Sequence, residues 1–204
     1  MNIDTETNYY KSVANRSFLR FLIGIFPRLK QWIYFVNNRR IARKKGALIG
    51  ENVILRKNIA QKANRNLKID DNSSIDAKKI DLRSPVSIGK NVIIGYDTEI
   101  ITTSHYINSP EYEHKYYGLE IEDYVWITSN VLILPSCRKI GYGSIIAAGS
   151  VVTKNVPPMS VIGGNPATII KDRKCVHNKV LVPSLLGGDF KFYIACWLKK
   201  TNRV

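Results

Sequence analysis

Residues 119–167 read LEIEDYVWITSNVLILPSCRKIGYGSIIAAGSVVTKNVPPMSVIGGNPA. Within them an aliphatic side chain returns at steps of six residues, with a single step of seven, and a compact side chain follows four residues after each. Such a short period predicts stacked repeats, because one unit is too small to bury its own apolar face. The aliphatic positions are Ile121, Ile127, Ile133, Ile140, Ile146 and Val152, and the compact ones are Val125, Val131, Cys137, Ser144, Ser150 and Val156.

A six-residue unit fits a short strand followed by a corner turn, which is the coil of a parallel β-helix. A helix is disfavoured because the stretch is rich in Ile and Val and is interrupted by glycine and proline. A β-sandwich is the alternative, but its strands alternate at two residues and turn every ~8–12 residues. The pattern therefore favours an all-β chain built as a parallel β-helix.

Weaker repeats precede this stretch, and residues 55–68 and 81–87 fit the unit poorly. Repeats near an end have no neighbour on one side, so they are expected to be atypical. We expect a β-helix domain over residues 46–171. Its earlier units open at Ile49, Ile69, Ile75, Ile88 and Ile94.

The formal net charge of +15 first suggests a nucleic-acid binder. However, residues 1–45 hold ten Lys or Arg against two acidic residues, and residues 168–204 hold eight against two. Residues 46–167 hold thirteen against twelve, so the repeat body is nearly neutral. We therefore expect no nucleic-acid partner.

The three cysteines, Cys137, Cys175 and Cys196, are odd in number and show no CxxC spacing. Neither a disulfide framework nor a metal site is therefore expected. No uninterrupted apolar run reaches the ~18 residues that span a bilayer, and the start lacks the features of a secretory signal. These features predict a cytoplasmic protein.

Residues 1–45 are expected to form a basic helical arm, divided at Pro27. Basic residues surround its apolar stripe, a combination that suits the surface of an anionic membrane. Packing of the stripe on the chain's own body or on a second subunit is the alternative. For the second basic segment, residues 172–204, we expect surface or lipid contact. The stripe consists of Phe18, Leu22, Ile25, Leu29, Trp32 and Val36, at steps of four and three.

The repeat stops at His105 and resumes at Ile121, so residues 106–118 leave the body as a polar and aromatic loop. Long insertions on a repeat scaffold often lie on the binding face. Histidine is suited to proton transfer near neutral pH, which makes His105 the candidate general base. A structural role is the alternative for a single histidine, and we assign that role to His114 and His177.

Four segments together resemble the hexapeptide-repeat acyltransferases, specifically the maltose and galactoside O-acetyltransferase branch and its relatives in capsule and exopolysaccharide synthesis. These segments are TTSH before the loop, EDYVWITSNVLILP, IGYGSIIAAGSVVTKNVPP and GGNPATIIK. The resemblance implies a left-handed β-helix, acetyl-CoA as co-substrate, and a homotrimer with sites between neighbouring prisms. The left hand comes only from the resemblance, since parallel crossovers are usually right-handed.

The resemblance also implies roles for single residues. His105 would take the proton from an acceptor hydroxyl as that oxygen attacks the thioester, without an acyl-enzyme. Ser129 would lie near the oxyanion, and Lys171 would meet the nucleotide phosphates. The other implied cofactor contacts are Trp126, Ala148 and Thr153 along the pantetheine arm and Asn165 and Pro166 at the adenine end.

Three departures from the family pattern stand out, of which one is the long basic tail after Lys171, a segment with no counterpart in the family. Thr128 occupies a position where the family usually has glycine, which narrows the approach of a cofactor to the backbone. The segment PSCRKIG carries one residue more than usual, so a bulge is expected near Arg138. Neither change removes a catalytic group.

These features favour an O-acetyltransferase acting on a sugar or a cell-surface polysaccharide, or on its precursor. Acetylation of an antibiotic or another small molecule is an alternative within the enzyme class. A non-catalytic β-helix that serves in assembly, with the basic ends as its binding parts, is the alternative outside it. A metal-dependent hydratase is disfavoured, because it needs several convergent ligands and the chain has three histidines.

Overall fold

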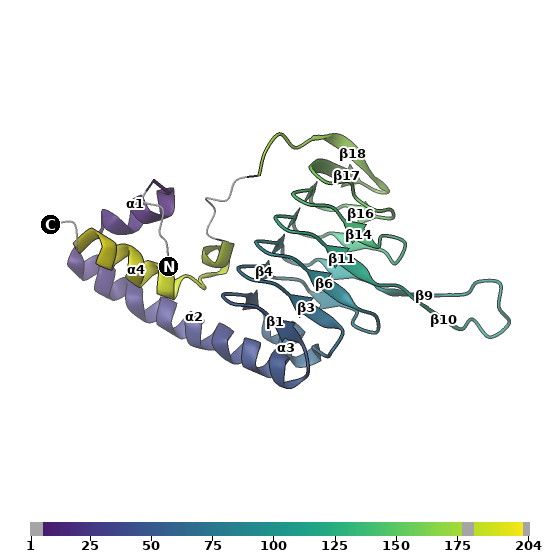
Figure 1. The fold of residues 1–204 in the computed structure, drawn as a ribbon, viewed down its shortest axis with the longest axis horizontal. Coiled ribbons are helices and arrows are strands. Elements are labelled where there is room, and N and C mark those ends of the chain that lie inside the picture. The colour runs from purple at the N-terminus through teal and green to yellow at the C-terminus, as the bar shows by residue number, and fades with distance from the viewer. Residues whose placement is uncertain (1–5, 177–181, 202–204) are drawn as a thin grey trace.

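The computed structural model describes residues 6–176 and 182–201. Three sheets, parallel except for one pair of strands at the end of one sheet, form the faces of a prism. A helical layer lies at one end of the prism and a hairpin projects from its side (Figure 1). Sheet I contains β1 (Leu48–Ile49), β3 (Leu67–Ile69), β6 (Val86–Ile88), β11 (Leu119–Ile121) and β14 (Lys139–Ile140).

Sheet II contains β2 (Ile54–Leu55), β4 (Ser74–Ile75), β7 (Ile93–Ile94), β12 (Trp126–Ile127), β15 (Ile145–Ile146), β17 (Ser160–Gly164) and β18 (Ala167–Asp172). Sheet III contains β5 (Lys79–Ile80), β8 (Glu99–Ile100), β13 (Leu132–Ile133) and β16 (Val151–Val152). The chain visits sheets I, II and III in turn, so each circuit makes one coil of the prism, and this confirms the expected β-helix.

The aliphatic positions of the repeat point into the prism and stack from coil to coil. In sheet II, Ile75 pairs with Ile94, Ile94 with Ile127, and Ile127 with Ile146. Each of these four side chains is at most 1% exposed. Burial of one such side chain contributes about 1.5–3 kcal/mol, so the column is a principal source of stability.

The corners of the prism explain the spacing between the strands. Several corner residues have positive φ, including Asn72 (59°), Asn91 (55°) and Asn130 (58°). Asparagine tolerates this left-handed conformation better than branched residues do. A two-residue strand and a tight corner together account for the six-residue step.

The irregular segments also have a structural cause. Within residues 55–68, α3 (Lys57–Lys62) takes the place of a sheet III strand in the first coil. The extra residue of PSCRKIG lies in a corner, where the amides of Arg138 and Lys139 donate to the side chain of Asn155. Strand β14 keeps a regular register with β11. The bulge expected near Arg138 is therefore wrong, because the corner absorbs the residue before the strand begins.

The N-terminal arm forms α1 (Asn8–Ala14) and one long helix, α2 (Phe18–Lys44). Pro27 lies inside α2, so the expected division at this residue is wrong. Proline removes one intrahelical hydrogen bond, but α2 is supported on both sides of Pro27 by other elements. Its N-terminal half packs on α4 (Phe190–Thr201), and its C-terminal half packs on the first coil.

Helices α1, α2 and α4 form a unit that we call the helical flank (Figure 1). Phe21 stacks on Tyr193 and Trp197, with ring centroids 5.0 Å and 4.2 Å apart. Asp189 accepts hydrogen bonds from Tyr9 Oη (2.5 Å) and Arg28 Nε (3.1 Å). The basic C-terminal segment thus contributes a helix that packs on the N-terminal arm.

The buried face of α2 differs from the stripe expected from the sequence. The buried positions are Phe21, Gly24, Phe35, Asn38 and Ala42. Of the expected stripe, Phe18 and Leu22 are exposed, and Ile25, Leu29, Trp32 and Val36 are partly buried. The expected face is rotated because α4 and the first coil, which the N-terminal periodicity does not reveal, select the packed side.

Polar side chains of α2 cover the start of the prism. Asn38 Nδ2 donates to the carbonyl of Leu55 (2.8 Å), and Arg39 donates to the carbonyl of Val53 (2.8 Å). Arg43 Nη2 donates to the carbonyl of Ile49 (2.6 Å). These carbonyls belong to the first coil, which has no preceding coil to pair with. At the opposite end, β18 turns back antiparallel along β17.

Candidate active site

The loop expected at residues 106–118 is a projecting hairpin (Figure 1). Its strands are β9 (Thr103–His105) and β10 (His114–Tyr116), paired antiparallel. Thr103 and Tyr116 pair at the foot, and His105 pairs with His114 at the far end of the ladder. His105 therefore lies within the hairpin, two residues beyond its foot.

The ring of His105 is held by the turn of this hairpin. Its Nδ1 contacts the carbonyl oxygen of Tyr112, and its ring centroid lies 4.5 Å from that of His114. A carbonyl oxygen only accepts hydrogen bonds, so Nδ1 carries the proton and Nε2 of the neutral ring carries the lone pair. The turn itself is fixed by hydrogen bonds from the amide of Tyr106 to Glu113 and from that of Tyr112 to Ser109.

A concavity of ≈ 850 Å³ adjoins His105. Lys115 Nζ lies 5.2 Å from the ring centroid of Tyr106 and 5.3 Å from that of Tyr117. Aromatic faces with nearby polar groups suit the mixed apolar and hydroxyl surface of a sugar. The lining residues are His105, Tyr106, Ile107, Asn108, Ser109, Glu113, Lys115 and Tyr117.

Two of the expected cofactor residues meet at one corner of the prism. Ser129 follows β12 and Ala148 follows β15, so both lie between sheets II and III. The amide of Gly149 donates to the carbonyl of Ser129 (3.2 Å), which joins the two coils there. Ala148 is exposed, and Ser129 is half-buried. Thr128 turns its hydroxyl to the carbonyl of Ile146 (2.8 Å).

Thr153 lies at a different corner. It follows β16, between sheets III and I, and the His105 hairpin leaves from this same corner after β8. The amide of Ile101 donates to Ile133 and that of Leu134 donates to Val152, which stacks the three coils at this corner. Thr153 is therefore on the same edge as His105, but two coils further on.

Trp126, Lys171, Asn165 and Pro166 lie on or beyond sheet II. Trp126 points outward from β12 and lines a cavity of ≈ 300 Å³. Lys171 is exposed on β18, opposite Val161. Asn165 and Pro166 form the exposed turn between β17 and β18. The cavity beside Trp126 is also lined by Asn91, Ile93, Tyr124, Arg173, Val182 and Leu185.

One chain thus brings only some of the expected site residues together. Ser129 and Ala148 share a corner, whereas His105 stands on a hairpin at another edge. None of the expected cofactor residues lines the concavity beside His105. His105, the expected general base, is therefore on a different edge of the prism from Ser129 and Ala148, and Thr153 shares its edge two coils further on.

Sequence reasoning missed two groups near His105. The Tyr112 carbonyl has no sequence signal, and its role depends on the hairpin turn. Asp81 accepts hydrogen bonds from Thr103 Oγ1 (2.8 Å) and from Arg83 Nε (2.9 Å), so it anchors the foot of the hairpin. Burial would raise the pKa of Asp81, but hydrogen bonds from Arg83, Thr103 and backbone amides outweigh it and hold that pKa well below its usual range.

Comparisons with known proteins agree with this architecture, although no protein-family model matches the chain. The galactoside O-acetyltransferase of Escherichia coli is 37% identical over 90 residues, which cover 43% of this chain and 44% of that protein. A protein of Escherichia coli named for acetyl transfer in colanic acid biosynthesis, WcaF, is 28% identical over 134 residues, covering 65% of this chain and 73% of that protein.

A solved hexapeptide-repeat acetyltransferase from Vibrio cholerae, complexed with acetyl coenzyme A, is 27% identical with a TM-score of 0.59. The match covers 85% of this chain and 94% of that one. In sequence and in fold this chain is therefore similar to the hexapeptide-repeat acetyltransferases. These similarities confirm the resemblance inferred from the sequence, and the fold matches the left-handed β-helix of the solved acetyltransferases.

The chain spans about half the length of several curated relatives that it matches, between 42% and 52% of each. In the part of the chain that the structure describes, no group of three or more His, Cys, Asp or Glu side chains is arranged to hold a metal ion. Over the same residues, no helix has the length and hydropathy needed to cross a bilayer. His177 lies outside the described residues.

Proposed function

We propose that this protein transfers an acetyl group from acetyl-CoA to a hydroxyl of a saccharide, with His105 as the general base. The observation that carries the proposal is the orientation of the His105 ring. Its Nδ1 is fixed on the carbonyl of Tyr112, which leaves Nε2 as the proton acceptor beside an aromatic-walled concavity.

In the proposed reaction, Nε2 of His105 removes the hydroxyl proton while the hydroxyl oxygen attacks the thioester carbonyl of acetyl-CoA. The C–S bond then breaks, and the imidazolium returns the proton to the departing thiolate. The Tyr112 carbonyl fixes the tautomer and the ring plane through both steps. Transfer is direct, so no acyl-enzyme is required.

We propose that two neighbouring chains form each site in a homotrimer. The separation of His105 from the corner at Ser129 and Ala148 within one chain supports this arrangement. The flat faces of the prism would allow the corner of one chain to meet the hairpin of the next, and three equivalent contacts close a ring. Lys171, Asn165, Pro166, Thr153 and Trp126 remain proposed contacts of the co-substrate.

The reaction is tested by thiol release from acetyl-CoA with purified protein and a panel of acceptors. The panel contains free sugars, acidic and neutral oligosaccharides, and small antibiotics. Turnover of a saccharide supports the proposal, whereas turnover of only an antibiotic places the chain in the alternative enzyme class. Absence of turnover with every acceptor, together with no binding of acetyl-CoA, would favour the non-catalytic alternative.

The shared site is tested by mixing two inactive variants. His105→Ala removes the base, and Ala148→Glu places bulk and negative charge at the exposed corner where an anionic co-substrate would lie. Each variant alone should be inactive, and mixed trimers should regain activity because some sites receive both intact residues. A monomeric species with full activity in sedimentation would refute the shared-site model.

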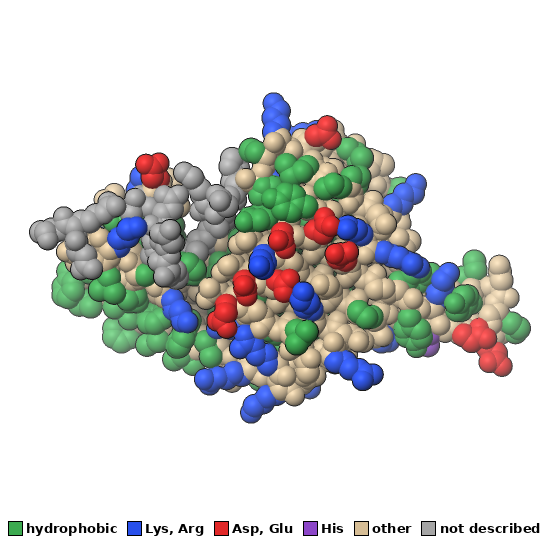
Figure 2. All heavy atoms as spheres, viewed as in Figure 1, with side chains coloured by type: hydrophobic (Ala, Val, Ile, Leu, Met, Phe, Trp, Pro, Cys, Tyr) green, Lys and Arg blue, Asp and Glu red, His purple; other side chains and the backbone are tan. Residues whose placement is uncertain are grey.

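We further propose that the helical flank binds an anionic membrane surface. The outer face of α2 exposes Ile23 (62%), Phe26 (75%) and Ile33 (55%) to solvent. Helix α2 carries seven Lys or Arg and no acidic residue. Figure 2 shows apolar side chains gathered over this side of the flank. Apolar anchors with surrounding cations are suited to an anionic lipid surface.

Not all basic residues of α2 are available for lipid. Arg28 pairs with Asp189, and Arg39 and Arg43 donate to carbonyls of the first coil. Lys30 and Arg40 are exposed and lie on the same helical face as Phe26 and Ile33. These cations and the exposed apolar side chains define the proposed lipid-facing surface.

Point substitutions test this surface better than removal of residues 1–45, since that deletion would also uncover the first coil. Ile23→Glu combined with Phe26→Glu should reduce binding to vesicles containing anionic lipid, and salt should weaken binding of the unchanged protein. Leu48→Glu is the matched control, because Leu48 is also exposed (65%) but lies on β1. If the double variant instead loses its oligomeric state, the face is a subunit interface.

A further inference from the structure

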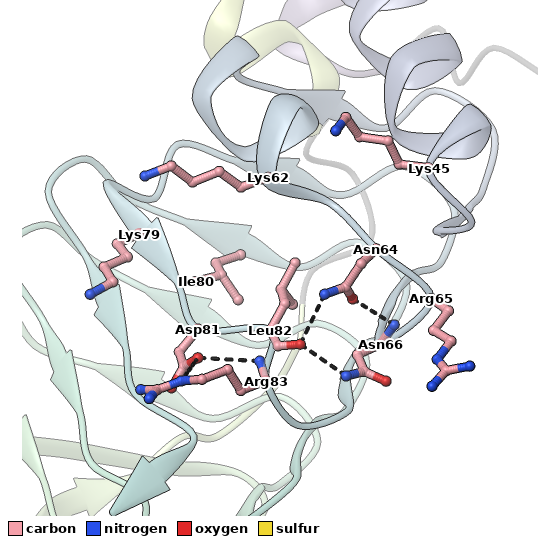
Figure 3. Close-up of a pocket in the computed structure, with 10 residues that line it drawn as sticks. All are labelled: Lys45, Lys62, Asn64, Arg65, Asn66, Lys79, Ile80, Asp81, Leu82 and Arg83. Carbon is pink, nitrogen blue, oxygen red and sulfur yellow. Dashed lines mark hydrogen bonds and ion pairs between the residues drawn. The ribbon is translucent and has the colours of Figure 1, made fainter.

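A second pocket lies in the first coils, beside the ends of α2 and α3 (Figure 3). It is on the edge between sheets III and I, from which the His105 hairpin leaves in a later coil. Its volume is ≈ 640 Å³. Ile80 and Leu82 lie at its centre, and cationic side chains lie around them (Figure 3). We call it the basic pocket; it is lined by Lys45, Lys62, Asn64, Arg65, Asn66, Lys79, Ile80, Asp81, Leu82 and Arg83.

The charge of the basic pocket is unbalanced. Its one carboxylate, Asp81, is engaged by Arg83 through two hydrogen bonds of 2.9 Å. Among residues 6–176 and 182–201, no carboxylate lies within ion-pair distance of the other four cations. Like charges gathered in a concavity repel one another unless an anion binds between them. The cations without an ion pair are Lys45, Lys62, Arg65 and Lys79, of which Lys79 lies opposite Glu99 in the pairing of β5 with β8.

Helix dipoles account for only part of this cluster. Lys45 is the C-cap of α2 and Lys62 is in the last turn of α3, where the negative end of each helix favours a cation. Arg65 lies in a loop and Lys79 lies on a strand, so no helix end explains them. The four cations come from four different parts of the chain and lie around one concavity (Figure 3).

The backbone that carries the pocket is held in place. Asn64 Nδ2 and Asn66 Nδ2 both donate to the carbonyl of Leu82, at 3.0 Å and 2.9 Å. The amide of Asn66 also donates to Asn64 Oδ1 (2.8 Å). These bonds tie the loop after α3 to the corner that contains Asp81 and Arg83, so the backbone on these two sides of the pocket is held in place.

Asp81 connects the basic pocket to the His105 hairpin. Its carboxylate accepts hydrogen bonds from Thr103 Oγ1 (2.8 Å) and the amide of Thr102 (3.3 Å). His105 is two residues beyond Thr103, which corresponds to about 7 Å along a strand. A group bound on the Asp81 side of the pocket would therefore lie next to the foot of the hairpin that carries His105.

We propose that the basic pocket binds the pyrophosphate through which an acceptor saccharide is attached to its carrier. The inference rests on the proposed acetyl transfer and adds a substrate class to it. Phosphate oxygens suit lysine-rich sites because each ammonium acts as a point charge toward several oxygens. The pocket has four unpaired cations and more room than a single phosphate needs, which favours a doubly phosphorylated link over one carboxylate.

Nucleoside-linked and polyprenol-linked sugars share this chemistry, and the experiment separates them. The protein is first saturated with coenzyme A, so that the phosphate site of the co-substrate is occupied. Inorganic pyrophosphate, UDP-glucose and a short-chain polyprenyl diphosphate sugar in neutral vesicles are then titrated by calorimetry. The tightest-binding carrier identifies the source of the pyrophosphate.

The pocket variant is Lys62→Ala with Lys79→Ala, and the matched control is Lys11→Ala with Lys90→Ala, two exposed lysines outside the pocket. Pyrophosphate binding should weaken about ten- to a hundredfold in the pocket variant and stay within about twofold in the control. The ratio of kcat/KM for the linked sugar to that for the free sugar should fall in the pocket variant.

Equal pyrophosphate affinity in the two double variants would overturn the proposal, as would failure of the wild-type protein to bind pyrophosphate when coenzyme A is present. The titrations do not require acetyl transfer. If pyrophosphate binds in the pocket but no acceptor is acetylated, the proposed function fails while the site stands. If a free saccharide is acetylated but pyrophosphate does not bind, the proposed function stands while the pyrophosphate site is rejected.

Discussion

The prism and the helical flank bury apolar side chains in opposite ways. In the prism, each coil rests on the next, as where Ser73 Oγ accepts from the amide of Val92, 19 positions away. In the flank, Tyr9 and Asp189 are 180 positions apart, and Tyr193 donates to the carbonyl of Phe21 from 172 positions away. The prism is built from near neighbours, whereas the flank joins the two ends of the chain.

This difference separates two kinds of stability. A prism coil is supported by identical contacts above and below, so its packing is distributed over many equivalent side chains. The flank depends on the aromatic stack around Phe21 and on the partly buried ion pair of Arg28 with Asp189, and neither contact is repeated elsewhere in the described chain. The flank should therefore open locally while the prism stays folded.

The largest expected effect is a loss of acetyl transfer that leaves both the prism and the flank folded. His105→Ala should lower acetyl transfer roughly 10²–10⁴-fold, the usual cost of removing a general base. Unfolding and acetyl-CoA binding should remain close to those of the unchanged protein, because His105 is exposed on the hairpin. Thiol release and calorimetry measure the two quantities, and turnover equal to that of the wild type would exclude this role.

Next in size is a cavity in the prism. Ile127→Ala removes a fully buried side chain from the sheet II column, and it should cost about 2–5 kcal/mol of the free energy of unfolding. The loss should appear in a cooperative transition of the whole prism, measured by denaturant unfolding. Ile170→Ala is the control, because Ile170 is exposed and its loss should change stability little.

A smaller effect is expected in the flank. Asp189→Asn removes the negative charge that faces Arg28 and Tyr9, and it should cost about 1–3 kcal/mol. The loss should be confined to the flank, so denaturant unfolding of the prism should shift less than in Ile127→Ala. A shift of equal size would mean that the two regions unfold together.

The reactivity of two buried thiols, one in the prism and one in the flank, can show whether the flank opens on its own. Burial raises the pKa of Cys137 in the prism and of Cys196 in the flank to about 11, and Asp189 adds to the rise at Cys196. Both thiols are therefore protonated at pH 8, and alkylation should be slow until the pH approaches their raised pKa. In Asp189→Asn, iodoacetamide should label Cys196 faster while Cys137 stays protected.

The smallest effect is expected where the two regions meet at the surface. Arg43 Nη2 lies 3.6 Å from Glu51, and the Glu51 side chain is 74% exposed. Glu51→Gln should change the free energy of unfolding by less than about 1 kcal/mol, because water screens this pair. Arg43→Ala should cost more, since Arg43 also donates to the Ile49 carbonyl. Equal costs for the two variants would mean that the carbonyl contact contributes nothing.

The same difference explains what the sequence predicted. The aliphatic positions of the repeat are all buried as expected, because in a repeat protein the sequence period directly indicates which side chains point inward. These positions are Ile121, Ile127, Ile133, Ile140, Ile146 and Val152. The prediction of the buried face of α2 was wrong, because Tyr193 and Trp197, on which this helix packs, lie at the other end of the chain. Pro27 was misjudged for a similar reason, since local preference did not include the support from α4.

In the candidate site, too, the features with a local sequence signal were predicted and those that depend on distant contacts were not. His105 was found because the period stops there, which is a local signal. The Tyr112 carbonyl that orients it and the Asp81 carboxylate that anchors Thr103 were missed, because both contacts exist only after the hairpin and coils have formed. The four cations of the basic pocket without an ion pair come from the C-cap of α2, from α3, from a loop and from a strand, so no single motif in the sequence predicts the pocket.

The two covered ends of the prism have a consequence for self-association. A stack of parallel coils would otherwise present an open row of backbone groups at each end, and such rows recruit strands from other molecules. Carbonyl groups of the first coil accept hydrogen bonds from Asn38, Arg39 and Arg43. At the other end, β18 pairs antiparallel with β17. Growth of the coil stack into fibres is thereby blocked at the start by side chains and at the finish by a reversal of strand direction.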